Sequence, residues 1–316
     1  MLGPKYLAVT LPCNVASLVV CVWLLSRLQA LPRHLRSLMF ARQMALLAWV
    51  NIGSVLGLTF FELVEFRLLE LGESVGLKWC QVTAIVFDVF RWAGVLVETH
   101  LALGTMATWW RWERLVWLLY AVLPWTVVLA GVAVGLEAFM HPVTYTQSGT
   151  CSWGSGADTV SAALLLGALV ISFGCYVACI VRSLRSPRPW ATVGQLAAVY
   201  PLNFFLTYAP LVLVNFDLTL VDTPLYVLAL AAEGLNGCVN GVTYFAQWRH
   251  ARGRARGARP RHGLRQIVSF HPYFRDTVEQ LDVAPVQREA LKRSEFQTEL
   301  LHVLVPNSRP TSRQRQ

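Results

Sequence analysis

Long apolar stretches alternate with short polar ones along the whole first part of the chain. A membrane-spanning α-helix needs about 20 mostly apolar residues, and seven stretches meet that requirement. They cover residues 7–27, 38–61, 80–109, 115–139, 159–181, 192–216 and 224–246. The pattern therefore predicts an all-α membrane protein: a seven-transmembrane-helix bundle over residues 1–247, followed by a basic tail over residues 248–316.

The composition agrees with a membrane protein. Only 14% of the 316 residues are charged, against about 25% in a typical soluble domain. The net charge of +9 comes mostly from arginines in loops and in the tail, which favours anionic lipid headgroups over nucleic acid as their partner. The tail arginines expected to face lipid are Arg249, Arg252, Arg254 and Arg256.

The charge of the connecting segments alternates along the chain. Segments 28–37, 110–114 and 182–191 and the tail are basic, whereas segments 62–79, 140–158 and 217–223 are acidic or lack Lys and Arg. Basic loops stay in the cytoplasm, so we expect the N-terminus outside and the C-terminus inside, in the plasma membrane. The segment before the first span is short, so a ligand would have to enter the bundle or its loops.

The third span carries four ionisable residues, which are costly at bilayer depth unless they face the protein interior. At 100° per residue, Arg91 lies about 20° round the helix from Cys80, and Glu98 lies on the same face as Cys80. We expect this face to point inward. His100 points the opposite way, as a hydrogen-bonded packing residue would.

A charged group in the outer half of the bundle is predicted from the third and seventh spans. Asp88 and Arg91 are three residues apart and are placed to pair, and Glu233 of the seventh span would lie near them. Two interpretations remain open: a structural ion pair, or a ligand cavity whose fixed cation meets an anionic or polar ligand.

Two cysteines fall on the outer side in this topology, where disulfides persist. Cys80 stands at the outer end of the third span and Cys151 in the second outer loop. A bond between them would fold the loop onto the bundle. Cys13 is a competing partner, and two free thiols are the other alternative.

Polar residues in the later spans suggest a network that could rearrange. Pro201 is the one proline expected to interrupt a span near its middle, without a counterpart in the other half. Asn236 and Asn240 are four residues apart on one helix face. Together with Glu98, Asn51 of the second span and Tyr244 they form either a switch or hydrogen bonds that merely join the helices.

These motifs resemble those of G-protein-coupled receptors. Residues 240–244, Asn-Gly-Val-Thr-Tyr, are similar to the NPxxY motif of rhodopsin-like receptors, with Gly241 in place of proline. Tyr200-Pro201-Leu202 resembles the cyclic-AMP-receptor group, and residues 96–101 resemble a run in secretin and adhesion receptors. The rhodopsin-like Asp-Arg-Tyr triplet is absent, since Gly-Thr-Met stands at residues 104–106.

The resemblance implies a cell-surface receptor that binds an extracellular ligand and activates a heterotrimeric G protein, without a cofactor. The alternative is a seven-helix transporter of a small polar solute. A retinal protein is excluded because its Schiff base needs a lysine in the last span, and the three lysines lie outside the predicted spans. No catalytic or metal-ligating set stands out.

Overall fold

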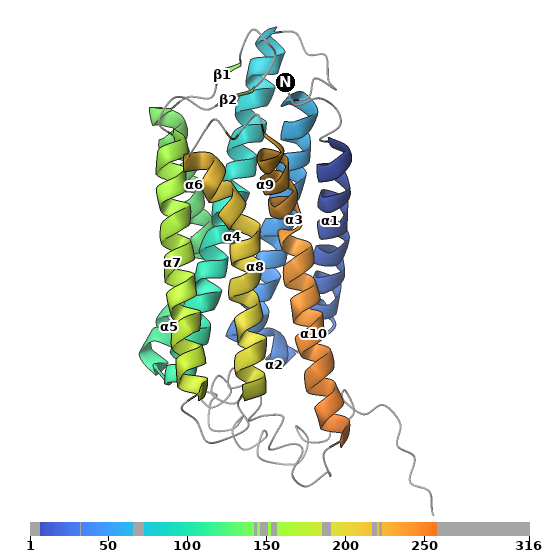
Figure 1. Cartoon of the computed structure of the whole chain (residues 1–316), viewed down its shortest axis with the longest axis vertical. Helices are drawn as coiled ribbons and strands as arrows, with labels where there is room; N and C mark the ends of the chain where they lie inside the picture. The colour runs from blue at the N-terminus through green and yellow to red at the C-terminus, as the bar shows by residue number, and fades with distance from the viewer. Residues whose placement is uncertain are drawn as a thin grey trace, which may run out of the picture. The chain divides into compact units, whose positions relative to one another are not determined.

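The computed structural model describes residues 7–31, 33–65, 73–141, 144–145, 151–152, 157–184, 191–216, 220 and 223–257. Nearly all of this part is helical (Figure 1). The helices are α1 (Leu7–Gln29), α2 (Arg33–Arg36), α3 (Met39–Glu65), α4 (Glu73–Trp110), α5 (Glu113–Val122), α6 (Trp125–Met140), α7 (Ala157–Leu184), α8 (Ala191–Phe216), α9 (Pro224–Gly234) and α10 (Asn236–Gly257). Two short strands, β1 (Thr144–Tyr145) and β2 (Cys151–Ser152), pair antiparallel.

The chain divides into two compact units, Met1–Tyr244 and Phe245–Gln316. The first unit contains the helices that could cross a membrane. Four of them, α1, α3, α4 and α7, are long and apolar enough, and the bent pairs α5–α6 and α9–α10 raise the number to six if each pair is one span. In α8 the apolar part found in the described residues is the shorter stretch Leu202–Phe216. The all-helical class is confirmed, and seven spans remain a prediction.

Two predicted spans are each broken into two helices. α5 and α6 meet at 58° around Pro124, whose ring removes a backbone donor. α9 and α10 meet at 46° around Leu235. α8, in contrast, runs through Pro201 without a break. The expectation that Pro201 alone interrupts a span is therefore wrong, because tertiary packing, not proline alone, decides where a helix breaks.

α4 packs against α3, α5, α6 and α7 and lies among the other helices of the bundle (Figure 1). Its predicted inward face is buried at Cys80, Phe87, Ala102 and Thr105. Five large apolar side chains of α4 are exposed instead, because they stand on other sides of the helix: Val75, Trp79, Val82, Val86 and Trp110. The periodicity of α4 thus separates an inward from an outward face as the sequence predicts.

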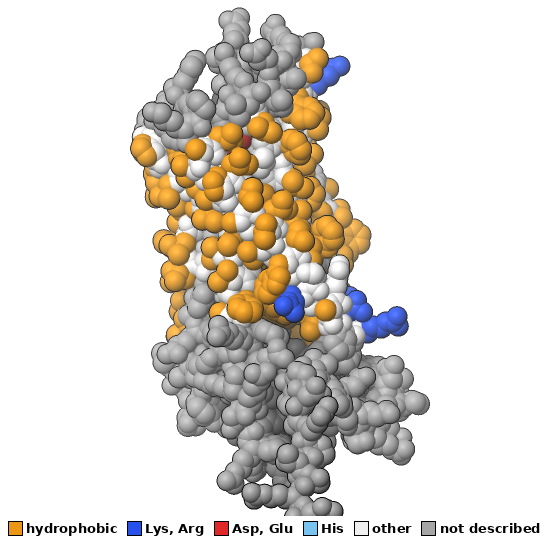
Figure 2. Space-filling model, turned by 90° about the vertical axis from the view of Figure 1, so that its right-hand side faces the viewer, with side chains coloured by type: hydrophobic (Ala, Val, Ile, Leu, Met, Phe, Trp, Pro, Cys, Tyr) orange, Lys and Arg blue, Asp and Glu red, His pale blue; other side chains and the backbone are white. Residues whose placement is uncertain are grey.

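Apolar side chains cover the sides of the first unit. Figure 2 shows one face as a continuous hydrophobic band, with Lys and Arg side chains toward its ends. Large exposed residues include Val19 on α1, Trp125 and Phe139 on α6, and Phe173 on α7. Contiguous apolar surface of this extent is unusual on a soluble monomer and suits contact with lipid chains.

Glycines allow α1 to lie directly on α9 and α10. A Cβ added at Gly234 would collide with the side chain of Asn14, and one at Gly237 would collide with Ser17 and Cys21. Ser17 Oγ also accepts a hydrogen bond from the N–H of Cys238, at 3.1 Å. This N–H lies in the first turn of α10, where the helix itself supplies no acceptor. The contact of α1 with α9 and α10 therefore depends on two residues without a side chain, Gly234 and Gly237, and on the Ser17 hydroxyl group, which caps α10.

Replacing Gly237 with Ala should destabilise the protein by about 1–3 kcal/mol, because the added methyl group overpacks the contact with α1. The matched control is Gly135→Ala on α6, where a Cβ meets nothing within 4 Å and where Ala should stabilise the helix by about 0.5–1 kcal/mol. Unfolding of the purified variants in detergent measures both. Equal effects at the two positions would contradict the close contact.

Candidate functional site

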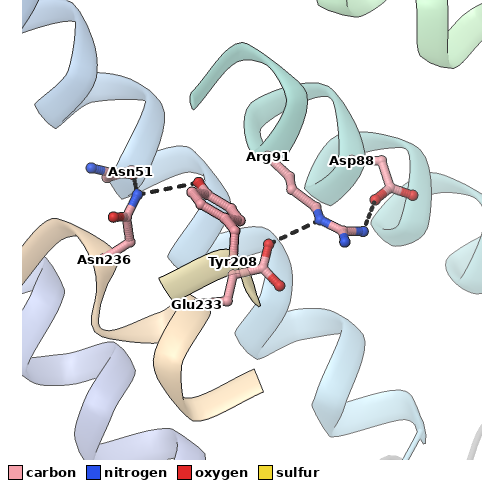
Figure 3. Close-up of polar contacts among 6 residues, drawn as sticks. All are labelled: Asn51, Asp88, Arg91, Tyr208, Glu233 and Asn236. Atoms are coloured by element: carbon pink, nitrogen blue, oxygen red, sulfur yellow. Dashed lines mark hydrogen bonds and ion pairs between the residues drawn. The ribbon is translucent and has the colours of Figure 1, made fainter. Parts of the chain in front are cut away.

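Buried polar side chains gather in two layers along the inward face of α4. The first, which we call the charged layer, consists of Asp88, Arg91 and Glu233. The second, the amide layer, consists of Asn51, Glu98, Tyr208, Asn236 and Asn240. Arg91 and Glu98 are seven residues apart, so the layers lie about 10 Å apart along the helix axis. Figure 3 shows parts of both layers.

The charged layer joins α4 to α9. Arg91 Nη1 donates to Asp88 Oδ1 at 3.3 Å, and Arg91 Nε lies 3.0 Å from Glu233 Oε1 (Figure 3). The pairing of Asp88 with Arg91, predicted from their spacing, is confirmed. The second contact is an ion pair without hydrogen-bond geometry, since both oxygens of Glu233 lack a hydrogen-bond partner in the described part of the chain. All three side chains are almost fully buried.

The amide layer centres on Glu98. Its Oε1 accepts hydrogen bonds from Asn236 Nδ2 at 2.7 Å and from Asn240 Nδ2 at 2.8 Å. Asn236 Nδ2 also approaches Asn51 Oδ1 and the Tyr208 hydroxyl, each at 3.3 Å. Glu98 Oε2 has no partner among the described residues. A buried carboxyl thereby links α4 to α10, and through Asn236 to α3 and α8.

The break between α9 and α10 lies between the two layers. Glu233 belongs to the last turn of α9 and Asn236 is the first residue of α10, so the two side chains reach different layers across the bend. The N–H of Leu235 at the break bonds to the carbonyls of Ala231 and Glu233. A change in the bend would therefore alter both layers together.

A glycine occupies the face of α4 between the layers. A Cβ placed on Gly94 would be 3.7 Å from the Tyr208 hydroxyl and 3.9 Å from Asn51 Oδ1. These are ordinary contact distances, so a methyl group fits there without displacing a neighbour. The helix thus exposes bare backbone to two polar oxygens at this level.

His100 holds a separate contact on the opposite side of α4. Gln43 Nε2 lies 2.8 Å from His100 Nδ1, and His100 Nε2 lies 2.7 Å from the carbonyl oxygen of Leu119. The neutral tautomer that donates from Nε2 satisfies both contacts. His100 is therefore a hydrogen-bonded packing residue that joins α3, α4 and α5, as its position on the helix predicts.

The other predicted residues lie apart from these layers or outside the described residues. Tyr244 stacks on Phe40, with 6.2 Å between ring centroids, and does not join the amide layer in the contacts that are described. The side chain of Pro201 lies outside the described residues. So do the side chains of Arg249, Arg252, Arg254 and Arg256, whose backbone continues α10 as far as Gly257.

The predicted disulfide is described at one end only. Cys80 is fully buried and disulfide-bonded. Cys13, the competing partner, is a free thiol, as are Cys21, Cys175, Cys179 and Cys238. The side chain of Cys151 lies outside the described residues, so its bond with Cys80 stays a prediction.

Tyr208 belongs to the amide layer and was not predicted from the sequence. Its hydroxyl contacts Asn236 in the amide layer, and its electrostatic neighbours include Glu233 and Arg91. A signal was present: Asn203 and Thr207 precede Tyr208 within an apolar run, and polar residues in a span usually face its interior. Asn203 Nδ2 does donate to Thr243 Oγ1 on α10, at 2.7 Å.

Comparison with known proteins adds no family. No family model matches the chain, and no curated protein matches it. Within the described residues, no three His, Cys, Asp or Glu side chains lie together as metal ligands would. The function must therefore be argued from the two layers themselves.

Replacing Arg91 with Met should destabilise the protein by about 3–5 kcal/mol, because Glu233 and Asp88 would stay buried without a cation. Adding Glu233→Gln to that variant should raise its free energy of unfolding again by at least about 1 kcal/mol, since one of the unpaired charges disappears. Unfolding of the purified single and double variants in detergent measures the coupling. Arg114→Met, at an exposed arginine, is the control, and strictly additive losses would contradict the ion pair.

Proposed function

We propose that the chain is a cell-surface G-protein-coupled receptor, with seven spans, the N-terminus outside and the C-terminus in the cytoplasm. An extracellular ligand binds in the outer half of the bundle, at the charged layer. A heterotrimeric G protein binds at the inner end. The bent pairs α5–α6 and α9–α10 and the helix α8 complete the seven spans with α1, α3, α4 and α7.

The observation that carries the proposal is the pair of layers on either side of the α9–α10 break. Arg91 holds Glu233 of α9, and Glu98 holds Asn236 and Asn240 of α10. A ligand that changes the contacts of Glu233 would change the direction of α9 relative to α10. Because α10 carries the amide layer, that change would alter the contacts of Glu98 toward the inner half. The bend between α9 and α10 would then have two arrangements, and a ligand that contacts Glu233 could favour one of them.

The orientation rests on charge. Arg33 and Arg36 of α2 are exposed, as are Arg111 and Arg114 at the turn between α4 and α5. Both segments belong to the end of the bundle away from Cys80, and basic residues concentrate on the cytoplasmic side of a plasma-membrane protein. The sequence after Tyr244 is rich in arginine, and in the proposed topology this tail is cytoplasmic, where anionic lipids would neutralise it.

The disulfide belongs to the outer end in the same proposal. β2 begins at Cys151 and pairs with β1, and β1 packs against α4. Five of the seven cysteines are free thiols and Cys80 is bonded, which supports Cys151 as its partner. The loop between α6 and α7 would then be fixed to α4 at Cys80, about 12 Å along the helix from Asp88 of the charged layer.

A transporter of a small polar solute is the second candidate, and one observation favours it. The described residues include two broken spans, α5–α6 and α9–α10, and paired broken helices in the two halves of a chain are typical of secondary transporters. Only the α9–α10 break adjoins both polar layers, however. The break at Pro124 lies outside them, so the receptor explains more of the buried polar residues.

The receptor should dissociate a heterotrimeric G protein in cells when a library that includes nucleotides, small acids and amines is applied. Glu98→Gln should raise basal dissociation, because weakening a hydrogen bond to a charged group, worth about 1.5–3 kcal/mol, loosens α10 from α4. A G-protein dissociation sensor measures this, alongside surface expression. Lys78→Gln, at an exposed lysine near Cys80 and away from the inner end, should leave both unchanged. Solute uptake without any G-protein response would favour the transporter instead.

Cys80→Ser and Cys151→Ser should each lower surface expression by a similar amount, because each removes the same bond. The double variant should be no worse than either single variant. Antibody labelling of intact cells measures the expression, and Cys13→Ser, at a free thiol, serves as control. Losses that add in the double variant would show that Cys80 and Cys151 are not bonded to each other.

A further inference from the structure

The charge of the site indicates what kind of ligand it accepts. The charged layer holds two carboxyl groups and one guanidinium group, so its full ionisation leaves one uncompensated negative charge. Arg91, the cation that an anionic ligand would need, is already engaged on both sides. Nη1 contacts Asp88 and Nε contacts Glu233, which leaves only Nη2 without a partner in the described part of the chain.

A third carboxyl group lies close to the same layer. Glu137 of α6 is near enough to Asp88 to repel its charge, and its Oε1 accepts a hydrogen bond from Ser161 of α7 at 3.1 Å. Acidic groups from α4 and α9 therefore contact one buried arginine, and a third acidic group, from α6, lies near Asp88. At such a site an added cation gains attraction, whereas an added anion meets an excess of like charge.

Glu233 is also able to accept more hydrogen bonds than it receives. Both of its oxygens lack a hydrogen-bond donor among the described residues, although the side chain is only 4% exposed. A buried carboxylate without donors is costly. An ammonium or guanidinium group that donates to it would remove this cost. Figure 3 shows that the carboxyl group of Glu233 points toward Arg91.

The sequence of the connecting segments has the same sign. In the proposed orientation, segments 64–79, 140–158 and 217–223 belong to the extracellular side, and they hold six acidic side chains against two basic ones. Lys5, before the first span, adds a third basic residue. An excess of negative charge on that side attracts cations from solution and repels anions.

We propose that the ligand of this receptor carries a primary amine or a guanidine, and that Glu233, supported by Asp88 and Glu137, holds the cationic group. The proposal rests on the proposed function, in which the charged layer is the ligand site. It replaces the expectation that Arg91 would meet an anionic ligand. In the bound state the added cation competes with Arg91 for Glu233, which supplies the change at α9 that the receptor requires.

The test uses matched probes that differ in charge. Butylamine, butylguanidine and phenethylamine are compared with butanol and phenethyl alcohol, and with butyrate and phenylacetate, by thermal unfolding of the purified full chain in detergent. The cations should raise Tm in a saturable way, and the neutral and anionic analogues should not. Glu233→Gln should weaken the apparent affinity for the cations by about tenfold or more, as expected for the loss of a charged hydrogen-bond partner.

Two further variants separate a lost site from a lost fold. Glu137→Gln, at the edge of the layer, should weaken cation binding by a smaller factor and leaves the Arg91–Glu233 pair intact. Glu113→Gln, at the first residue of α5 and far from the charged layer, should bind like the wild type. If the cations stabilise both glutamine variants at positions 233 and 113 equally, or stabilise none of the proteins, the inference is wrong.

The outcome also distinguishes this inference from the proposed function. Stabilisation by the carboxylates that is lost in Arg91→Gln would overturn the cationic ligand and keep a ligand site at the charged layer. Saturable binding of the cations, without G-protein dissociation by any compound, would keep the cationic site and overturn the receptor.

Discussion

A guanidinium group buried in an apolar bundle is the constraint on which the rest of the structure depends. Removing Arg91 from water is unfavourable unless carboxylates are held close to it. Asp88 is supplied by the same helix, but Glu233 must come from α9. The last span must therefore reach α4 at this level, and Glu233 and Asn236, on either side of Leu235, both contact α4.

The amide layer also holds a buried ionisable group, Glu98, but the groups that donate to it are amides. Glu98 is buried beside amide groups that donate to Oε1, so this oxygen is satisfied by dipoles and not by a full charge. Hydrogen bonds of this kind constrain direction more than ion pairs do. The charged layer thus tolerates small displacements of α9, whereas the amide layer fixes the rotation of α10.

Much of this could be predicted from the sequence where contacts are local. The inward face of α4, the Asp88–Arg91 pair and the shared face of Asn236 and Asn240 follow from helical periodicity. The bends between α5 and α6 and between α9 and α10 do not follow from helical periodicity. Pro124 is a sequence signal for the first bend, because proline removes a backbone donor, whereas Leu235 carries no signal for the second. Where a helix bends depends on neighbouring helices, as the uninterrupted course of α8 through Pro201 shows.

The glycines of α9 and α10 have a mechanical consequence. Because Gly234 and Gly237 bring α1 into direct contact, and Ser17 caps the N–H of Cys238, α10 cannot swing away without exposing a backbone donor and an empty groove to lipid. We therefore expect α1 and α10 to move together. A rearrangement at the break would be transmitted to the N-terminal helix, although no residue of α1 belongs to either polar layer.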